Sequence, residues 1–200
     1  MDKFRKIWDN RITVLLILAN VILFLVIEIN GNSGEAEYIR RMGGMYPEDI
    51  LVRKEYWRFF TSAFLHYGFE HLFSNMIVLG AAGIHLEHAL GHVKYALLYL
   101  ISAFSGSVLS YVMMVRSGDY AVSAGASGGI FGIIGGLLWV VIINKGNYET
   151  LHTKGLILMI VLTLYYGITT AGVDNWGHVG GLLMGFAMSC ILYRRKPQKY

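Results

Sequence analysis

Residues 120–144 read YAVSAGASGGIFGIIGGLLWVVIIN and contain no Asp, Glu, Lys or Arg. A helix of this length crosses about 30 Å of hydrocarbon, because each helical residue adds about 1.5 Å. We predict a membrane-spanning helix within this stretch, over residues 124–144. Stretches of similar length and apolar character predict further spans at residues 12–30, 94–115, 155–172 and 176–193.

The composition of the whole chain also indicates a membrane protein. Of its 200 residues, 55% are hydrophobic and 15% are charged, whereas a soluble domain carries about 25% charged residues. This balance excludes an ordinary water-soluble domain and a disordered chain. The net charge of +4 comes mainly from the two ends of the chain, which favours a membrane surface over nucleic acid as the partner. The single cysteine, Cys190, excludes an internal disulfide and a cysteine-based zinc cluster.

Residues 71–90 are more polar than the other predicted spans. Their polar side chains include Asn75, His85, Glu87 and His88. Residues 76–84 are uncharged, however, and the whole segment has the length of a spanning helix. We therefore predict a sixth span at 71–90.

The distribution of Lys and Arg predicts the topology. Basic residues precede the first span and follow the last, namely Lys3, Arg5, Lys6, Arg11, Arg194, Arg195, Lys196 and Lys199. Because flanking basic residues stay in the cytoplasm, both termini are expected there, which requires an even number of crossings. We thus predict an all-α membrane protein, with one six-helix bundle over residues 1–200 and both termini cytoplasmic. The segment 31–70 would be a long outer loop, whose Tyr56–Phe60 stretch has the aromatic character of an interfacial anchor.

A serine flanked by glycines stands at the outer end of the fourth span, in the sequence Gly-Ala-Ser127-Gly-Gly. Glycines let backbone amides approach a ligand without interference from Cβ. The plainer interpretation is a serine that packs in a glycine-rich helix. A second residue is needed to decide between the two.

His178 is that second residue. It follows the outward-facing Asp174 by four residues, so it lies at a depth similar to that of Ser127. A buried Ser and a buried His at one depth indicate a nucleophile and a general base. No carboxylate accompanies them at that depth, so we expect a dyad rather than a triad. A lone membrane histidine would otherwise be a residue that hydrogen-bonds between helices.

His71 and Asn75 are four residues apart and therefore share one helical face at the outer end of the second span. Both could donate hydrogen bonds to a developing oxyanion. Without the serine, they would be interpreted as polar contacts between helices.

These residues together resemble the rhomboid family of intramembrane serine proteases, over nearly the whole chain. The matching pieces are Trp57-Arg58, His71-x-x-x-Asn75, Gly125-x-Ser127-Gly128, and His178 followed by Gly181 and Gly185. The resemblance implies that Ser127 is the nucleophile and His178 the base. It also implies an oxyanion hole formed by His71, Asn75 and the Ser127 amide, and a first loop held by Arg58.

The resemblance further implies supporting residues around the pair. The family often has a tyrosine four residues after the serine, packed on the imidazole, and Phe131 stands at that position here. Gly181 and Gly185 share the helical face of His178. On the fourth span, glycines recur beside the face of Ser127, at residues 128, 132 and 136. Faces without side chains allow close packing, which would bring the Ser127 hydroxyl within about 3 Å of the imidazole.

The expected function is hydrolysis of a peptide bond in or near a transmembrane segment of another membrane protein, through an acyl-enzyme on Ser127. A helical substrate hides its carbonyls, so the cleaved stretch should unwind. The resemblance implies small residues at the cleavage point and lateral entry from the lipid bilayer. No cofactor, metal or nucleic acid is expected. The compact chain suggests a multi-pass protein of a bacterial plasma membrane.

Three alternatives remain at the level of sequence. The first is a zinc site, because His85, His88 and His92 share a helical face near Glu87 and could ligate the metal. An HExxH pattern is absent, however. The three histidines also lie at the cytoplasmic end of the span, where they can simply be solvated. A non-catalytic rhomboid-like binder of transmembrane helices is disfavoured by the presence of both Ser127 and His178. A transporter is disfavoured because acidic residues are missing from the span centres.

Overall fold

The computed structural model describes residues 10–170 and 172–195. The terminal basic residues Lys3, Arg5, Lys6, Lys196 and Lys199, which entered the topology prediction, lie outside this part of the chain. The described elements follow in the order α2 (Arg11–Asn30), α3 (Ala36–Arg41), α4 (Pro47–Leu51), α5 (Arg58–Thr61), η1 (Ser62–Phe64), α6 (Gly68–Leu90), α7 (His92–Ser117), α8 (Ser127–Ile143), β1 (Asn147–Tyr148), β2 (Leu151–His152), α9 (Thr153–Thr169) and α10 (Asn175–Leu192). The chain is therefore mostly helical, as its composition predicts.

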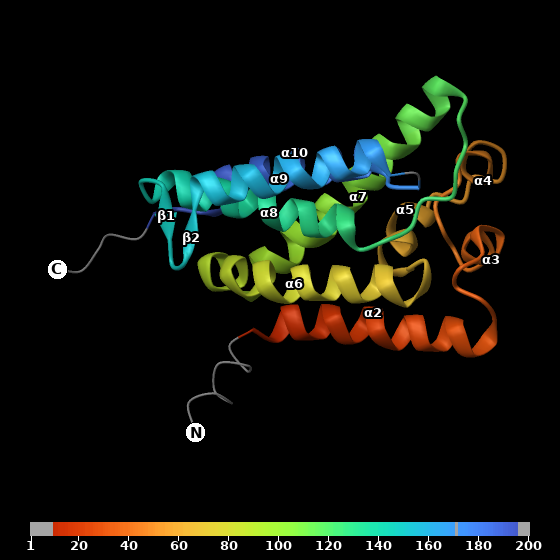
Figure 1. Ribbon diagram of the computed structural model, residues 1–200, viewed down its shortest axis with the longest axis horizontal. Helices are drawn as coiled ribbons and strands as arrows, with labels where there is room; N and C mark the ends of the chain where they lie inside the picture. Colours follow the sequence, from red (N-terminus) through yellow and green to blue (C-terminus); the bar gives the residue numbers. More distant parts are fainter. Residues whose placement is uncertain (1–9, 171, 196–200) are drawn as a thin grey trace.

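A long helix overlaps each of the six predicted spans. Helices α2 and α6 lie side by side, whereas α8, α9 and α10 lie on the other side of α6 (Figure 1). Within the described ranges, α2 and α7 have both the length and the hydropathy of a membrane span, and α8 and α9 are apolar but have 17 residues each. The crossing of a bilayer by all six helices stays a prediction.

The segment 31–70 contains more regular structure than the sequence predicts. It holds three short helices and a 3-10 turn, and α6 begins at Gly68 rather than at residue 71. The short helices have only four to six residues each, too few to show a periodic apolar face or to be stable alone. They are held by tertiary contacts, since Ile39 of α3 and Ile50 of α4 are almost completely buried.

Helix α8 lies at the centre of the fold. Its side chains Ile133 and Leu137 pack with Leu79 of α6 and Leu98 of α7, and all four are fully buried. Helix α10 packs against α8 and α7. The centre of the fold is thus built by the helix that starts with Ser127.

Glycines bring α8 and α10 into backbone contact. A Cβ built on Gly181 would overlap the carbonyl oxygen of Gly128, and one on Gly185 would overlap that of Gly132. The expected close packing of the fourth and sixth helices is therefore confirmed.

The buried carboxylate of Glu87, on α6, caps the start of α2. It accepts hydrogen bonds from the backbone N–H groups of Ile12 and Thr13, both at 2.9 Å, and from the Thr13 hydroxyl at 2.6 Å. The first N–H groups of a helix have no partner within it, and an acidic group there is favoured by the helix dipole. This explains why an acidic residue stands in a predicted span.

Candidate active site

One cavity gathers the four residues that the sequence singles out. Its volume is about 1070 Å³, and Ser127, His178, His71 and Asn75 all line it. Helices α6, α8 and α10 each contribute to the wall. Three helices that are distant in sequence therefore bring a hydroxyl, two imidazoles and an amide to one space.

Ser127 is the first residue of α8. The first hydrogen bond of this helix runs from the Ile130 N–H to the Ala126 carbonyl, so the amides of residues 127–129 precede the first intrahelical donor. The turn before the helix needs a glycine, because Gly125 has a φ of +147° and a Cβ there would lie 2.9 Å from Cε1 of His71. The same Cβ would lie 3.7 Å from the Ser127 hydroxyl, so the turn brings His71 close to the serine.

The imidazole of His178 stacks on Phe131, with ring centroids 4.2 Å apart and an angle of 8° between the planes. His178 is 8% exposed, and its Nδ1 has no hydrogen-bond partner in the part of the chain that the structure describes. Phe131 is four residues after Ser127 on α8. One helix thus carries both the serine and the ring that orients the histidine.

Ser127 and His178 are not joined by a hydrogen bond within residues 10–170 and 172–195. Catalytic hydrogen bonds are often long in the absence of substrate and tighten when it binds. The expected approach of about 3 Å therefore stays a prediction, which the shared cavity supports.

Asp174 caps the helix that carries His178. Its carboxylate accepts from the Gly177 N–H at 2.9 Å and from the Ser123 hydroxyl at 2.6 Å. This bond to Ser123 links the start of α10 to the segment that leads into Ser127. Asp174 thus caps the helix with its side chain, and its carbonyl oxygen accepts the His178 N–H at 3.2 Å.

Asn75 and His71 present donors to the cavity. The side-chain nitrogen of Asn75 is buried and has no partner among the described residues. Nδ1 of His71 accepts from the Tyr67 N–H at 3.4 Å, so the proton of a neutral ring lies on Nε2. A buried donor without a partner costs free energy, and a substrate oxygen would supply the missing acceptor.

His66 does not line the cavity but contacts His71, which does, and the sequence does not single it out. It is 1% exposed, its Nε2 accepts from the Ala126 N–H at 3.4 Å, and its ring centroid lies 5.2 Å from that of His71. Burial lowers the pKa of His66 to about 3, so the ring is neutral and can accept this hydrogen bond. The available signal was a histidine in the apolar run before α6, but nothing in the spacing connects it to Ala126.

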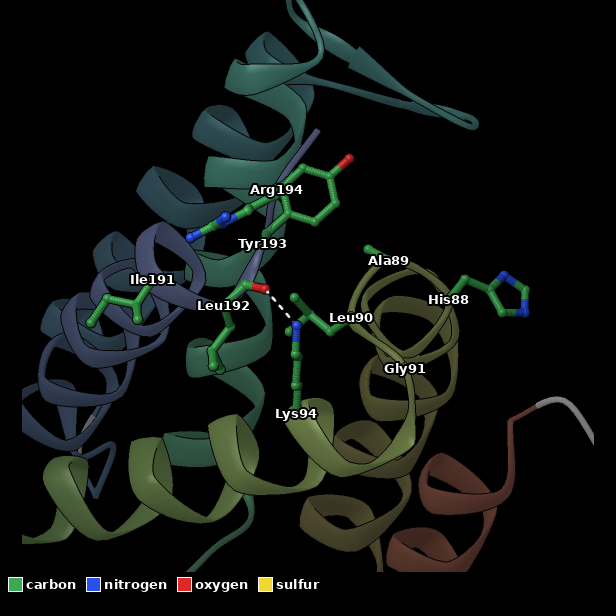
Figure 2. A pocket seen from close by; sticks show the side chains of 9 residues that line it. All are labelled: His88, Ala89, Leu90, Gly91, Lys94, Ile191, Leu192, Tyr193 and Arg194. Atoms are coloured by element: carbon green, nitrogen blue, oxygen red, sulfur yellow. Dashed lines mark hydrogen bonds between the residues drawn. The ribbon is translucent and has the colours of Figure 1, made fainter. Parts of the chain in front are cut away.

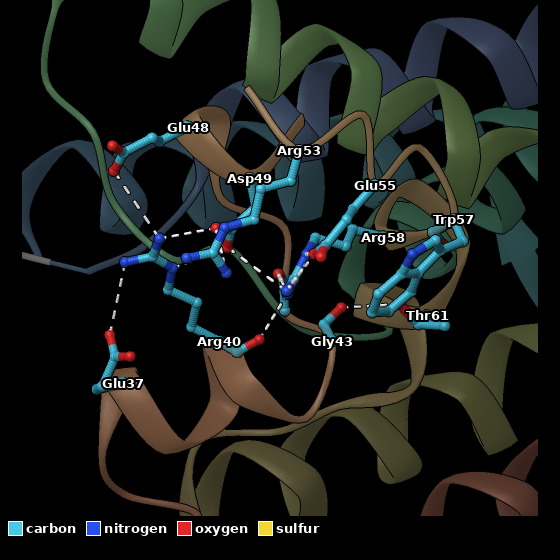
Figure 3. Close-up of polar contacts among 11 residues, drawn as sticks. Glu37, Arg40, Gly43, Glu48, Asp49, Arg53, Glu55, Trp57, Arg58 and Thr61 are labelled. Atoms are coloured by element: carbon cyan, nitrogen blue, oxygen red, sulfur yellow. Dashed lines mark hydrogen bonds and ion pairs between the residues drawn. The ribbon is translucent and has the colours of Figure 1, made fainter. Parts of the chain in front are cut away.

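Arg58 organises the segment 31–70 (Figure 3). Its guanidinium donates to the carbonyl oxygens of Arg40 and Gly44, and it forms ion pairs with Glu55 and Asp49. Arg40 donates two hydrogen bonds of 2.7 Å to Asp49, which is fully buried. The Arg40 hydrogen bond lowers the pKa of Asp49, which therefore stays ionised.

This segment is attached to the site through Met45. Met45 and Ser123 exchange backbone hydrogen bonds of 2.9 and 2.8 Å, and Ser123 also binds Asp174. The loop, the approach to Ser127 and the start of α10 are thus held together.

The histidines near the other end of α6 do not form one cluster. His85 and His88 both contact Glu149 of the hairpin, whereas Nδ1 of His92 lies 2.6 Å from the Glu87 carboxylate. Across the described residues, no group of three or more His, Cys, Asp or Glu could hold a metal ion. The alternative of a zinc site has no support in this geometry.

Comparisons with known proteins show similarity to one family. A model of the Rhomboid domain matches residues 53–195. The chain is 34% identical over 180 residues to the rhomboid protease GluP of Bacillus subtilis (strain 168), covering 90% of this chain and 34% of GluP. It is 37% identical over 159 residues to the RHOMBOID-like protein 4 of Arabidopsis thaliana, covering 78% of this chain and 39% of that protein. It is 31% identical over 150 residues to the putative rhomboid protease YdcA of B. subtilis, covering 75% of this chain and 74% of YdcA. The chain thus spans between a third and two fifths of the length of GluP and RHOMBOID-like protein 4.

Proposed function

Because this chain belongs to the rhomboid family, we propose that it is an intramembrane serine protease that hydrolyses peptide bonds in or near the transmembrane segments of other membrane proteins. The domain would extend over residues 1–200, with six spans and both termini in the cytoplasm. Such a chain is an integral, multi-pass membrane protein. Its relatives come from a bacterium and from a plant, and a bacterial plasma membrane stays a prediction for its host membrane.

The observation that carries the proposal is the shared cavity. Ser127 and His178 line it from two helices in backbone contact, and Phe131 holds the imidazole against one wall. The unpartnered amide of Asn75 lines the same space. This arrangement contains a nucleophile, a base and a donor for a developing negative charge.

In the first half of the reaction, the Ser127 hydroxyl attacks the carbonyl carbon of the substrate peptide bond while His178 accepts its proton. The C–N bond then breaks, and the protonated His178 returns the proton to the leaving amine. The carbonyl fragment remains as an ester on Ser127. In the second half, His178 takes a proton from water, the resulting hydroxide attacks the ester, and the proton returns to the serine oxygen.

Both steps place a negative charge on the carbonyl oxygen of the substrate. Asn75, His71 and the Ser127 amide are the donors for this oxygen, and donors that are fixed before the reaction stabilise the charge most effectively. Gly125 allows this geometry because a side chain there would meet the His71 ring. The four-residue spacing between Ser127 and Phe131, about one helical turn, would keep the imidazole that stacks on Phe131 beside the hydroxyl.

The shape of the cavity supports entry of a substrate from the lipid. Beyond Asn75, the wall continues along Val78 of α6 and along Met159, Thr163 and Tyr166 of α9. A transmembrane segment that enters between α6 and α9 would reach Ser127 along this wall. Its cleaved stretch must unwind, because helical carbonyls are engaged in hydrogen bonds. Helix-weakening and small residues would favour this step.

The direct test is incubation of the purified chain with a panel of single-span membrane proteins, with Ser127→Ala as the control. We expect cleavage by the wild-type chain only. Labelling by a fluorophosphonate, which reacts with activated serines, should likewise require Ser127. If neither cleavage nor labelling depends on Ser127, the chain is a non-catalytic binder of transmembrane helices.

A further inference from the structure

A second cavity lies at the end of the helices opposite to Ser127. Its volume is about 510 Å³, and it is formed where α6 ends, α7 begins and α10 ends. Figure 2 shows the side chain of Lys94 rising from the first turn of α7 between Leu90 and Leu192. None of the residues placed in the proteolytic site lines this space.

The walls of this cavity carry positive charge. Lys94 and Arg194 line it, and its nine lining residues include no Asp or Glu. The carboxylate of Glu149 contacts His88 but does not belong to the lining. The Lys94 ammonium donates one hydrogen bond, of 3.1 Å, to the Leu192 carbonyl, which leaves two further N–H donors. The cavity therefore offers charged donors that lack an anionic partner among the described residues.

An apolar wall adjoins these charges. Leu90, Ile191 and Leu192 line the cavity, and Ile191 is 76% exposed. A ligand that satisfies both parts of the wall has an anionic head and a hydrocarbon chain. Arg and Lys side chains both bind phosphate, and phosphate is the anionic head of a phospholipid.

We propose that this cavity binds an anionic phospholipid, with its phosphate between Lys94 and Arg194 and the start of an acyl chain along Ile191. In the proposed membrane topology, on which this proposal rests, this end of the helices faces the cytoplasmic leaflet. Anionic lipids of that leaflet attract basic groups near the membrane surface. The bound lipid would link the first turn of α7 to the end of α10, the helix that carries His178.

The test uses the full chain in a neutral detergent and counts bound lipid by native mass spectrometry during titration with phosphatidylglycerol or phosphatidylcholine. We expect wild-type protein to retain phosphatidylglycerol preferentially. Lys94→Gln and Arg194→Gln should each weaken this binding by about tenfold, because each removes one charge-assisted contact. Arg194→Gln is informative even if Lys94→Gln loosens the end of α10 by removing the bond to Leu192. Lys154→Gln is the matched control, since Lys154 lies at the same end of the molecule but outside the cavity.

Equal lipid retention by the wild type and both variants would overturn the proposal, and so would an equal loss in Lys154→Gln. A parallel experiment compares the thermal stability of the protein with phosphatidylglycerol and with inorganic phosphate alone. If phosphate reproduces the full lipid effect in a Lys94-dependent way, the site binds a soluble anion and the lipid assignment is wrong. The readouts do not require proteolysis, so Ser127→Ala protein should bind the lipid unchanged, and failure here would leave the proposed protease activity untouched.

Discussion

The rings of Phe131 and His178 lie almost parallel, 4.2 Å apart, although one belongs to α8 and the other to α10. Stacking of this kind contributes about 0.5–1.5 kcal/mol beyond simple burial. Phe131→Leu should therefore leave the fold intact and lower kcat by about tenfold, because the imidazole loses its fixed orientation. Phe131→Tyr retains the ring and should stay close to wild type.

The control for this prediction is Phe186→Leu. Phe186 also lies on α10 and packs edge-on against Trp139, but it does not line the cavity. Steady-state cleavage of one transmembrane substrate compares the variants. If Phe186→Leu lowers kcat as much as Phe131→Leu, the effect is general loosening of the helices and the positioning role is wrong.

Ser127→Ala and His178→Ala should each remove essentially all proteolysis without loss of expression. The double variant should be no worse than either single variant, because the two residues act as one unit. Quantitative cleavage assays with long incubation measure the residual rates, and addition of a chelator should change nothing. Residual cleavage by Ser127→Ala above background would contradict the dyad.

Asn75→Ala should slow turnover by about 10²-fold or less, because His71 and a backbone amide would still donate hydrogen bonds to the oxyanion. The serine should still react with a fluorophosphonate, since Asn75 does not activate the nucleophile. Parallel measurements of kcat and of labelling rate separate the two effects. An unchanged kcat would mean that the role of Asn75 is structural.

Gly181→Val should lower activity by about 10²-fold even where the protein inserts, because its side chain would collide with the Gly128 carbonyl and separate α10 from α8. Gly80→Ala is the matched control on α6. Its Cβ would lie 3.7 Å from Cδ1 of Ile17, an ordinary contact, so activity should be nearly unchanged. Full activity of a well-expressed Gly181→Val variant would show that these helices do not need to meet there.

The stability of the segment 31–70 should depend on pH through Asp49. An unfolded Asp has a pKa of about 3.9, and the hydrogen bonds from Arg40 lower the pKa of Asp49 in the folded protein. The stabilisation is therefore complete above about pH 4. It is lost as the pH falls through the folded pKa, because the unfolded chain takes up the proton more readily.

Thermal unfolding between pH 5 and pH 2, followed by the fluorescence of Trp57 and the other tryptophans, measures this dependence. The unfolding temperature of the wild type should fall more steeply as the pH is lowered than that of Asp49→Asn, whose side chain cannot ionise. Asp49→Asn should also be destabilised at pH 7, by roughly 3 kcal/mol, because Arg40 and Arg58 lose a buried partner. Identical acid profiles of the two proteins would show that Asp49 is not the group that titrates.

Local features of the sequence determined much of the architecture. Uncharged stretches of about twenty residues predicted where the long helices lie. A helix that crosses the hydrocarbon core needs about this many consecutive, predominantly apolar residues. Spacing within one helix placed Phe131 beside Ser127, and Asn75 beside His71, because residues four apart share a helical face. The glycines of α8 and α10 similarly predicted a close approach that the structure confirms.

Other features were decided only by the tertiary structure. Spacing along one helix carries no information about partners that lie far away in sequence. Glu87 could not be connected to the start of α2, nor His66 to the Ala126 amide. The short helices of segment 31–70 were missed for the same reason, since their stability comes from contacts such as that of Asp49 with Arg40 rather than from their own sequence. The sequence determined which groups lie on each helix, whereas packing decided which groups from different helices meet.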